Sequence, residues 1–219
     1  WRCANERAQA QSVAAAIERG CEFRMANLIE SPTVPEPVTI RDIVLRDGST
    51  LALRPGRAGD ADALLQFFAQ LSRQSRYQRF FGFPVLDGDG ARRLLVSDAP
   101  EAMALVGEVS GRMVAFAGFY RANGQADRAE VAFAIADALQ GRGIGTRMLE
   151  QLSEIARRRG IRTFEASVLA DNRRMLDVFT DCGFSVTTRQ DGGVVEVTIG
   201  LEPTASFVAK SAERAQHAA

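Results

Sequence analysis

Short apolar runs separated by Gly, Asp and Asn fill most of residues 39–202, and this pattern predicts β-strands. Two β-prone runs between residues 43 and 55 flank Asp47-Gly48, the strongest short-range signal for a hairpin. Further strands are expected at 102–109, 113–120, 129–135, 162–168, 184–188 and 194–201. Only a Ser110-Gly111 turn separates the first two of these, so they are expected to form an antiparallel pair.

Between the strands, apolar residues recur at the spacing of amphipathic helices. Helices are expected to begin after Asp60, at Ser72, near Leu94, after residue 145 and at Asn172. Asp60 and Ser72 have the short polar side chains that are preferred at helix N-termini. The second helix carries Arg76-Tyr77-Gln78-Arg79-Phe80-Phe81, whose aromatic residues either belong to the core or line a groove for an acceptor substrate.

The two ends of the chain differ in composition from the middle. Residues 1–38 are alanine-rich up to Gly20 and then contain three prolines, which predicts a short helix followed by a Pro-rich linker. Residues 204–219 are mostly small and polar, and we expect a flexible, frayed tail there. The predicted organisation is therefore one domain over residues 39–203 with an extension at each end.

Residues 129–146 combine an apolar run, a loop with Gly141, Gly143 and Gly145, and the start of a helix. Glycines permit a positive φ and a close approach of the backbone, and a helix N-terminus favours an anion, so a pyrophosphate would fit here. The Walker loop needs a Gly-Lys-Ser/Thr sequence, and the dinucleotide loop needs a further glycine at Thr146 or Met148; this chain has neither. A plain tight turn remains the alternative.

Composition excludes several classes of protein. The 219 residues are 46% hydrophobic, which suits one domain with its own core, and the net charge of zero gives no global basic field for nucleic acid or an anionic membrane. Lys210 is the only lysine, and the only histidine, His217, lies near the end of the chain. These counts argue against a Schiff-base lysine, a Ser-His-Asp triad and a histidine-containing metal site.

Three features of the sequence bear on location. Cys3, Cys21 and Cys182 form no spaced pair, which suits reduced thiols. No apolar run approaches the length of a membrane-spanning helix, and the N-terminus lacks the pattern of a signal peptide. We therefore expect a soluble, cytoplasmic protein without a membrane partner.

The order of predicted elements, together with Gln140-x-x-Gly143-x-Gly145, resembles the GNAT superfamily of N-acetyltransferases over about residues 40–202. Within it, three stretches resemble the bacterial protein-lysine acetyltransferase (Pat-like) group. They are Asp47 to Pro55, Ser75 to Phe81, and Asn172-Arg173-Arg174-Met175 before Gly183-Phe184. The resemblance implies an α+β fold of the GNAT type, an acyl-CoA N-acyltransferase with a mixed central sheet flanked by helices. It also implies acetyl-CoA as co-substrate, without a metal.

Acetyl transfer to a lysine needs a base, because only about one lysine amine in 2,500 is neutral at pH 7. Glu130 is the candidate, since it lies ten residues before Gln140 on the strand that leads into the loop, and apolar neighbours would raise its pKa. The position also matches the glutamate base of similar acetyltransferases. The alternative is that Glu130 simply lies on the solvent face of a strand, alternating with Val131 and Phe133.

The resemblance also assigns the acyl-CoA contacts. Backbone amides of Gln140, Gly141, Arg142, Gly143, Ile144, Gly145 and Thr146 are expected to hold the pyrophosphate. The backbone of Phe133 and Ile135 is expected to hold the pantetheine arm, with one N–H polarising the thioester carbonyl for a contribution of about 3 kcal/mol. Asn172 matches a residue that often meets the CoA arm, and it can also cap the helix that it opens.

The leaving thiolate is protonated in many GNAT enzymes by a tyrosine of the last helix, where this chain has Phe179. The Pat-like group also lacks that tyrosine. A thiol with a pKa near 8.5 leaves tolerably well as thiolate, so solvent can supply the proton; Tyr120 is a weak substitute.

Three hypotheses follow for the function. The first is acetylation of a lysine side chain in a protein, such as an acyl-CoA synthetase, by direct attack of the amine. The second keeps this chemistry with a small amine as acceptor, which acidic residues in the acceptor groove would favour. The third is a non-catalytic acyl-CoA sensor.

Overall fold

The computed structural model describes residues 41–44, 48–95, 102–121 and 125–216. The chain divides into a unit of residues 1–37 and a unit of residues 38–219, and the described residues all belong to the second. The helix and Pro-rich linker expected at 1–38 and the central residue Asp47 of the expected hairpin turn lie outside the described residues.

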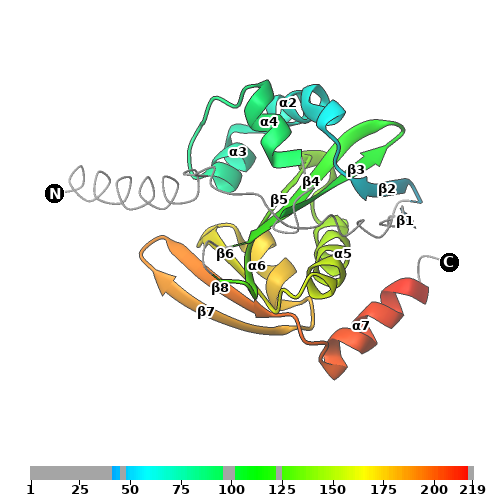
Figure 1. Ribbon diagram of the computed structural model, residues 1–219, viewed down its shortest axis with the longest axis vertical. Coiled ribbons are helices and arrows are strands. Elements are labelled where there is room, and N and C mark those ends of the chain that lie inside the picture. Colours follow the sequence, from blue (N-terminus) through cyan, green and yellow to red (C-terminus); the bar gives the residue numbers. More distant parts are fainter. Residues whose placement is uncertain (1–40, 45–47, 96–101, 122–124, 217–219) are drawn as a thin grey trace, which may run out of the picture. The chain divides into compact units, whose positions relative to one another are not determined.

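Eight strands form one mixed sheet with the order β1-β2-β3-β4-β5-β6-β8-β7 (Figure 1). Neighbouring strands are antiparallel except β5 and β6, which are parallel. The expected hairpin is present as the pair β1 and β2. The bounds are β1 Arg41–Val44, β2 Thr50–Pro55, β3 Ala102–Val109, β4 Arg112–Arg121, β5 Arg128–Ile135, β6 Thr163–Leu169, β7 Ser185–Asp191 and β8 Val194–Gly200.

The α-helices are α2 Ala61–Gln70, α3 Arg73–Phe80, α4 Gly88–Leu95, α5 Ile144–Arg158, α6 Arg173–Thr180 and α7 Ala205–Gln216, and two short 3-10 helices are η1 Ala58–Asp60 and η2 Asp137–Leu139.

Ser72 caps α3 as expected, because its hydroxyl accepts a hydrogen bond from Ser75 N at 3.1 Å. Asp60 does not cap α2 with its side chain. Its carboxylate instead accepts two hydrogen bonds from the Arg54 guanidinium, at 2.7 and 2.8 Å, and one from Arg57 N.

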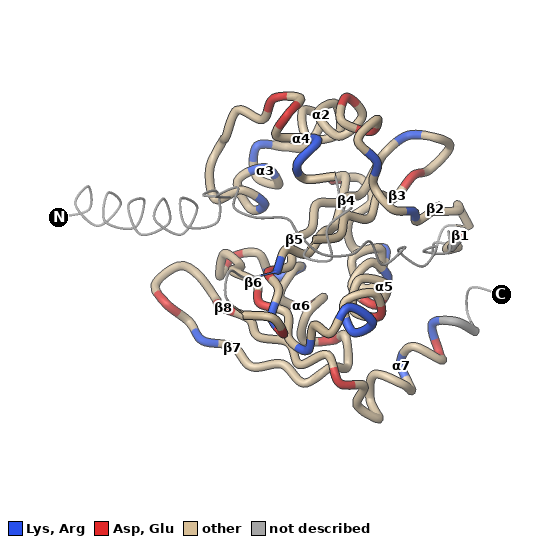
Figure 2. Tube along the Cα trace, in the orientation of Figure 1, with Lys and Arg blue, Asp and Glu red and all other residues tan. Residues whose placement is uncertain are grey.

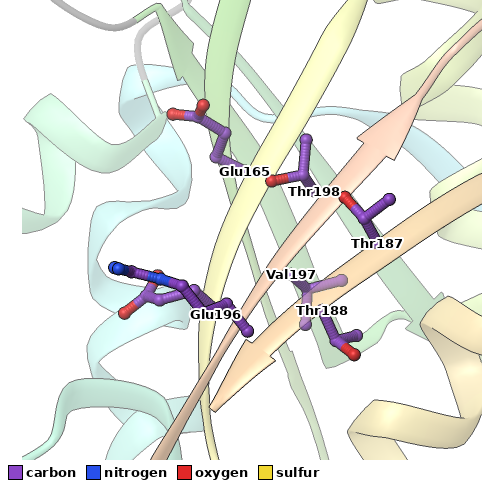
Figure 3. Close-up of a pocket in the computed structure, with 7 residues that line it drawn as sticks. Glu165, Thr187, Thr188, Glu196, Val197 and Thr198 are labelled. Atoms are coloured by element: carbon purple, nitrogen blue, oxygen red, sulfur yellow. The ribbon is translucent and has the colours of Figure 1, made fainter. Parts of the chain in front are cut away.

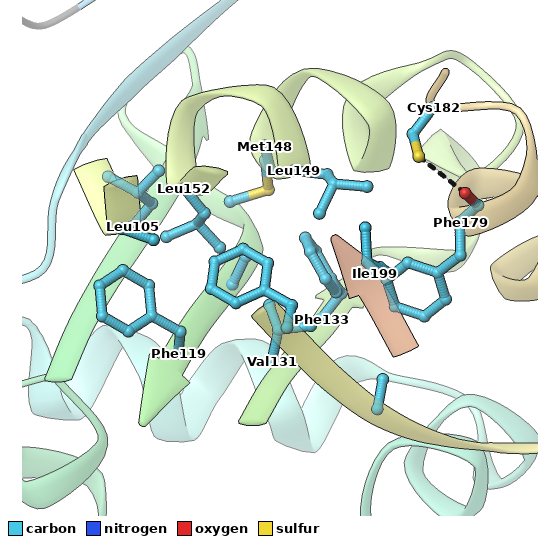
Figure 4. Packing of buried hydrophobic residues seen from close by; sticks show 14 of the residues in the cluster. Leu105, Phe119, Val131, Phe133, Met148, Leu149, Leu152, Phe179, Cys182 and Ile199 are labelled. Carbon is cyan, nitrogen blue, oxygen red and sulfur yellow. Dashed lines mark hydrogen bonds between the residues drawn. The ribbon is translucent and has the colours of Figure 1, made fainter. Parts of the chain in front are cut away.

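Each face of the sheet has its own apolar core, because side chains alternate between faces along a strand. Helices α2 and α4 cover one face, where Leu64, Phe68 and Leu95 pack with Phe116 of β4. Helix α5 covers the other, and its apolar stripe packs with β-strand residues from the opposite side of the same strands (Figure 4). That cluster includes Phe119, Phe133, Met148, Leu149, Leu152, Phe164, Phe179 and Cys182.

The prediction of a frayed C-terminal tail is wrong for residues 205–216, which form α7. Thr204 begins the helix, because its hydroxyl accepts from Phe207 N at 3.0 Å and donates to Gly183 O. The Phe207 ring stacks on Phe184 with centroids 4.0 Å apart, and this contact gives the helix an apolar anchor. The segment is rich in Ala, Lys, Glu, Arg and Gln, all good helix formers, and this was the signal available in the sequence.

Candidate active site

The parallel pairing of β5 with β6 covers Arg128–Glu130 and Thr163–Glu165 and stops there. Beyond this point β5 stays paired with β4 up to Ile135, while β6 pairs with β8. Ala136 N donates to Val114 O on the β4 side at 2.8 Å, so the alternation along the strand turns the amides of Phe133 and Ile135 away from β4. These backbone groups therefore line an opening in the sheet of the kind that the GNAT resemblance implies for a pantetheine arm.

The glycine loop follows β5 and ends at the first turn of α5. Gly141 and Gly143 have φ values of 76° and 85°, and Gly143 is the N-cap residue of α5. A Cβ at either position would meet no atom within 4 Å, so the left-handed backbone rather than a lack of space requires glycine there. Arg147 N bonds back to Gly143 O, and the amides of Ile144, Gly145 and Thr146 form the open first turn. This arrangement fits a pyrophosphate.

Gly145 has a different structural role from the other two glycines. A Cβ here would lie 3.2 Å from Val178 Cγ2 of α6 and 3.4 Å from Ile135 Cδ1 of β5. The small residue therefore allows α5, α6 and β5 to pack closely behind the loop. The sequence attributed all three glycines to the conformation and close approach of the backbone. Only Gly141 and Gly143 have a positive φ.

The side chain of Gln140 connects the loop to neighbouring elements. Its Nε2 donates to Ile135 O and to Ser75 Oγ of α3, both at 3.1 Å, and its Oε1 accepts from Arg174 Nη1 of α6 at 2.9 Å. The Gln140 side chain thus ties the loop to β5, α3 and α6, in addition to the contact with pyrophosphate that is expected of its backbone amide. The side chain of Asn172 caps α6, since its Oδ1 accepts from Met175 N at 3.2 Å.

Asp137 joins the start of α3 to the segment after β5. Its carboxylate accepts from Ser72 N at 2.9 Å and from the hydroxyls of Ser72 and Ser75, both at 2.7 Å. Burial raises the pKa of Asp137, but these hydrogen bonds together outweigh it and hold the pKa below its ordinary value. Asp137 was not recognised in the sequence, because its partners lie more than 60 residues away.

Glu130 lies in a polar row that crosses the sheet. Its registered partners are Tyr120 on β4 and Glu165 on β6, and the row continues through Thr198 on β8 to Thr187 on β7. Directly paired residues point to the same face, so these side chains are neighbours. The Glu130 side chain remains accessible to solvent, as the alternative from the sequence required, yet it belongs to a cluster of ionisable groups.

The neighbours of Glu130 set its acidity. Desolvation of part of the side chain by nearby protein atoms is the largest effect and raises the pKa of Glu130; Arg79 on α3 opposes it, and the carboxylates of Glu196 and Glu165 add to it. The net direction is upward, as the sequence predicted, although two of the causes are acidic residues from distant strands. A carboxylate with a raised pKa is a better proton acceptor for an ammonium group.

A cavity of about 490 Å³ adjoins Glu165 on this face. Figure 3 shows Glu165, Thr198 and Thr187 on successive strands, with Glu196 and Thr188 nearby. Glu165 accepts from Arg128 Nη1 at 2.5 Å, and Glu196 accepts from Ser167 Oγ at 2.8 Å. The cavity thus lies beside Glu165, the registered partner of the candidate base, and its lining combines two carboxylates and three threonines with Arg189, the registered partner of Glu196.

The structure does not favour Tyr120 as a proton donor for the thiolate. The Tyr120 hydroxyl donates to Leu94 O at 2.9 Å, and burial raises its pKa to about 12, so its proton is held by the protein. Phe179 is buried and packs edge-to-face on Phe133 with centroids 5.8 Å apart. The Cys182 thiol is buried and donates to Phe179 O at 2.7 Å, which is a structural role in the core (Figure 4).

The aromatic residues of the segment 76–81 and the nearby Phe83 divide between core and surface. Phe80 packs edge-to-face on Phe68 at 5.1 Å, whereas Tyr77 and Phe83 are 45% and 47% exposed and lie 5.9 Å apart. The same helix, α3, also carries Arg73, Arg76 and Arg79 (Figure 2). The core interpretation therefore holds for Phe80, while a role of Tyr77 in an acceptor groove stays a prediction.

Within the described ranges, no helix is both long and apolar enough to cross a lipid bilayer. The same residues contain no group of three or more His, Cys, Asp or Glu side chains arranged to hold a metal ion.

Comparison with known proteins identifies the class. The Acetyltransferase (GNAT) family profile matches residues 64–184, more than half of the chain. The chain therefore belongs to the GNAT family, whose members are acetyl-CoA-dependent acyltransferases, and the mixed sheet flanked by helices is the GNAT fold.

Individual relatives support a Pat-like member of this family. Acetyltransferase Pat of Mycolicibacterium smegmatis is 30% identical over 168 residues, which are 76% of this chain and 50% of Pat. Acetyltransferase PA5475 of Pseudomonas aeruginosa is 32% identical over 146 residues, 64% of this chain and 77% of that protein. This chain thus spans about half the length of Pat and more than two thirds of PA5475.

Solved structures agree with this assignment. The GNAT domain of S. lividans PAT is 36% identical, with a TM-score of 0.68 over 78% of this chain and 99% of that domain. The acetyltransferase yncA of Salmonella typhimurium, solved with its cofactor acetyl-CoA, shares the fold at 21% identity, with a TM-score of 0.57 over 71% of this chain and 96% of that one.

Proposed function

We propose that this domain transfers the acetyl group of acetyl-CoA to the side-chain amine of a lysine in a protein. The observation that carries the proposal is the position of Glu130 at the point where β5 and β6 cease to pair, on the strand that leads into the glycine loop. The same strand thus presents a carboxylate with a raised pKa and then the backbone groups suited to an acyl-CoA. Similarity to the GNAT domain of S. lividans PAT supports the same function.

In this mechanism Glu130 removes a proton from the incoming ammonium, directly or through water. The neutral amine then attacks the thioester carbonyl, so that a C–N bond forms; the nitrogen loses its second proton to solvent and the C–S bond breaks. The amide N–H of Phe133 or Ile135 polarises the carbonyl oxygen, for a contribution of about 3 kcal/mol. The sulfur leaves as thiolate and takes its proton from solvent, because the Tyr120 hydroxyl is bonded to Leu94 O.

The chain's own residues would hold the co-substrate as follows. The first-turn amides of α5 and the loop residues Gln140 to Thr146 bind the pyrophosphate, with the positive end of the α5 dipole adding to the attraction. Phe133 and Ile135 bind the pantetheine arm through their backbone groups. Asn172, at the start of α6, adds a contact to the arm through groups that the helix cap leaves available.

A small cationic amine is the second candidate acceptor, and the cavity beside Glu130 is the observation that favours it. Glu165 and Glu196 in its lining would attract an ammonium group as readily from a polyamine as from a lysine, although Arg128, paired with Glu165, and Arg189, opposite Glu196, reduce this attraction. The exposed apolar side chains of Tyr77, Phe83 and Val85 favour the protein acceptor instead, because they offer contact area that a small molecule does not need. We place the reaction in the cytoplasm, where the buried free thiol of Cys182 would stay reduced.

Incubation with labelled acetyl-CoA tests the proposal directly. The purified protein would be offered a panel of cytoplasmic proteins, including an acyl-CoA synthetase, and a panel of small amines, with release of free thiol followed in parallel. Glu130→Gln tests the base, and Glu202→Gln, an 82% exposed glutamate outside the site, is the matched control. We expect label on a protein lysine with the wild type and with the control. With Glu130→Gln, the rate of label transfer should be lower by about 100-fold or more.

Other outcomes separate the alternatives. Label found only on small amines would transfer the assignment to the second acceptor class. Tight binding of acetyl-CoA without transfer to any acceptor would favour the sensor hypothesis.

A further inference from the structure

The side chain of Gln140 occupies a backbone group at the opening in the sheet. Its Nε2 donates to Ile135 O at 3.1 Å. Ile135 turns its N–H and C=O away from β4, because the next residue, Ala136, bonds through its N–H to Val114 O on the β4 side. The carbonyl that Gln140 uses is therefore one of the groups that face the opening, where the pantetheine arm is expected.

The partners of Gln140 permit one orientation of its carboxamide. Ile135 O can only accept a hydrogen bond and the Arg174 guanidinium can only donate one. Nε2 must therefore face the strand, and Oε1 must face α6, where it accepts from Arg174 Nη1 at 2.9 Å. Nε2 also donates to Ser75 Oγ, whose own proton goes to Asp137 Oδ1 at 2.7 Å. The carboxamide is thus held by β5, α3 and α6 together.

The bond to Ile135 O limits what the edge of β5 can offer to a ligand. Each residue that faces the opening carries one N–H and one C=O. Gln140 leaves to a ligand the Ile135 N–H and both backbone groups of Phe133. The pattern along a strand edge repeats every two residues, about 7 Å, so an arm that contains amides has more than one register in which to pair. With Gln140 in place, an N–H of the arm can bond to Phe133 O and not to Ile135 O.

We propose that Gln140 is a positioning residue that sets the register of the pantetheine arm along β5. This inference rests on the proposed function, which assigns the arm to the backbone of Phe133 and Ile135. Glu130 lies on the same strand, on the far side of Phe133 from the loop, so a shift of the arm to Ile135 O would move the thioester about 7 Å from the base. Attack by the amine requires the reacting atoms to lie within about 3–3.5 Å, so the shifted register is unproductive.

The contrast between kcat and acetyl-CoA affinity separates this role from simple support of the loop. Gln140→Met keeps the length of the side chain and removes the donor to Ile135 O; Gln140→Ala repeats the measurement if the Met variant does not fold. Gln70→Met makes the same change at the exposed end of α2 and is the matched control. Calorimetry gives the dissociation constant of acetyl-CoA without an acceptor, and thiol release with a lysine acceptor gives kcat.

We expect kcat to fall by about threefold or more in Gln140→Met, because part of the acetyl-CoA binds in the unproductive register. The dissociation constant should stay within about twofold of wild type or become lower, since the second register adds to binding. Both quantities should stay within twofold of wild type in the control.

A kcat within threefold of wild type in Gln140→Met, or a dissociation constant raised more than twofold, would overturn this inference, because a side chain that only supports the loop acts on affinity. Full turnover in Glu130→Gln would instead count against the base in the proposed function and not against the register of the arm.

Discussion

Glu130 combines access to solvent with neighbours that disfavour its charge. Its backbone position at the end of the parallel pairing exposes the carboxylate, while Glu165 and Glu196 lie on the next strands of the same face. Natural proteins often retain such unfavourable local arrangements where activity requires them. Two consequences can be measured on single substitutions.

Glu130→Gln is expected to raise the melting temperature at neutral pH. The raised pKa means that folding disfavours the ionised form, so the destabilisation is complete above the folded pKa and absent below the unfolded one. Gln removes this effect, and the gain should shrink as the pH falls through the folded pKa. Thermal unfolding followed across pH checks the prediction, and a lower melting temperature at neutral pH would contradict it.

Glu196→Gln should shift the acid limb of kcat/KM to lower pH. Removal of a neighbouring negative charge lowers the pKa of Glu130, so the base stays ionised in more acidic solution. The shift should be less than about one unit, since the side chains retain access to water. A limb that moves to higher pH would show that Glu196 does not act on the base through its charge.

At the scale of elements, the glycine loop determines where an acyl-CoA could bind. Two glycines supply left-handed backbone, and the third allows α5 and α6 to pack on β5. Local signals of this kind are visible in a sequence, and so are the strand, loop and helix around them. The hydrogen bonds that join Asp137, Ser75 and Gln140 are not visible in the sequence, because these residues come together only when α3 packs beside the segment after β5.

Gly143→Ala is expected to weaken acetyl-CoA binding and to lower stability by about 1 kcal/mol, because Ala is strained at the φ of 85°. Gly193→Ala is the matched control: a Cβ there has open space, and the backbone is not left-handed. Calorimetric titration and chemical denaturation measure the two effects. Equal behaviour of the two variants would argue that the loop tolerates a different backbone and that glycine is not required at residue 143.

At the scale of the whole molecule, α7 is part of the domain. The buried Glu150 of α5 pairs with Arg147 at 3.1 Å and with Arg214 of α7, whose Nε donates to it at 2.6 Å. Gly183, with φ of 90°, lies against the backbone of Phe207, and a Cβ there would come within 2.8 Å of Phe207 Cα. The order of strands and helices could be predicted from the sequence; the docking of this last helix could not, because Phe207 and Val208 are its only large apolar residues.

Phe207→Ala is expected to destabilise the domain by about 2 kcal/mol, less than a fully buried Phe, because Phe207 is only partly buried against Phe184. Val208→Ala, at a 58% exposed position of the same helix, should cost less than about 0.5 kcal/mol. Urea denaturation of both variants measures the difference. Similar midpoints for the two would mean that α7 does not contribute to the stability of the sheet.

The central claim is that acyl-CoA binding and base catalysis use different residues of one strand. The most direct measurement titrates acetyl-CoA calorimetrically into wild type and Glu130→Gln and then follows thiol release by the same preparations with a reactive lysine acceptor. The account predicts dissociation constants within about twofold and a kcat lower by about 100-fold or more in the variant. A variant that binds acetyl-CoA normally and retains the wild-type kcat would contradict the assignment of Glu130 as the base.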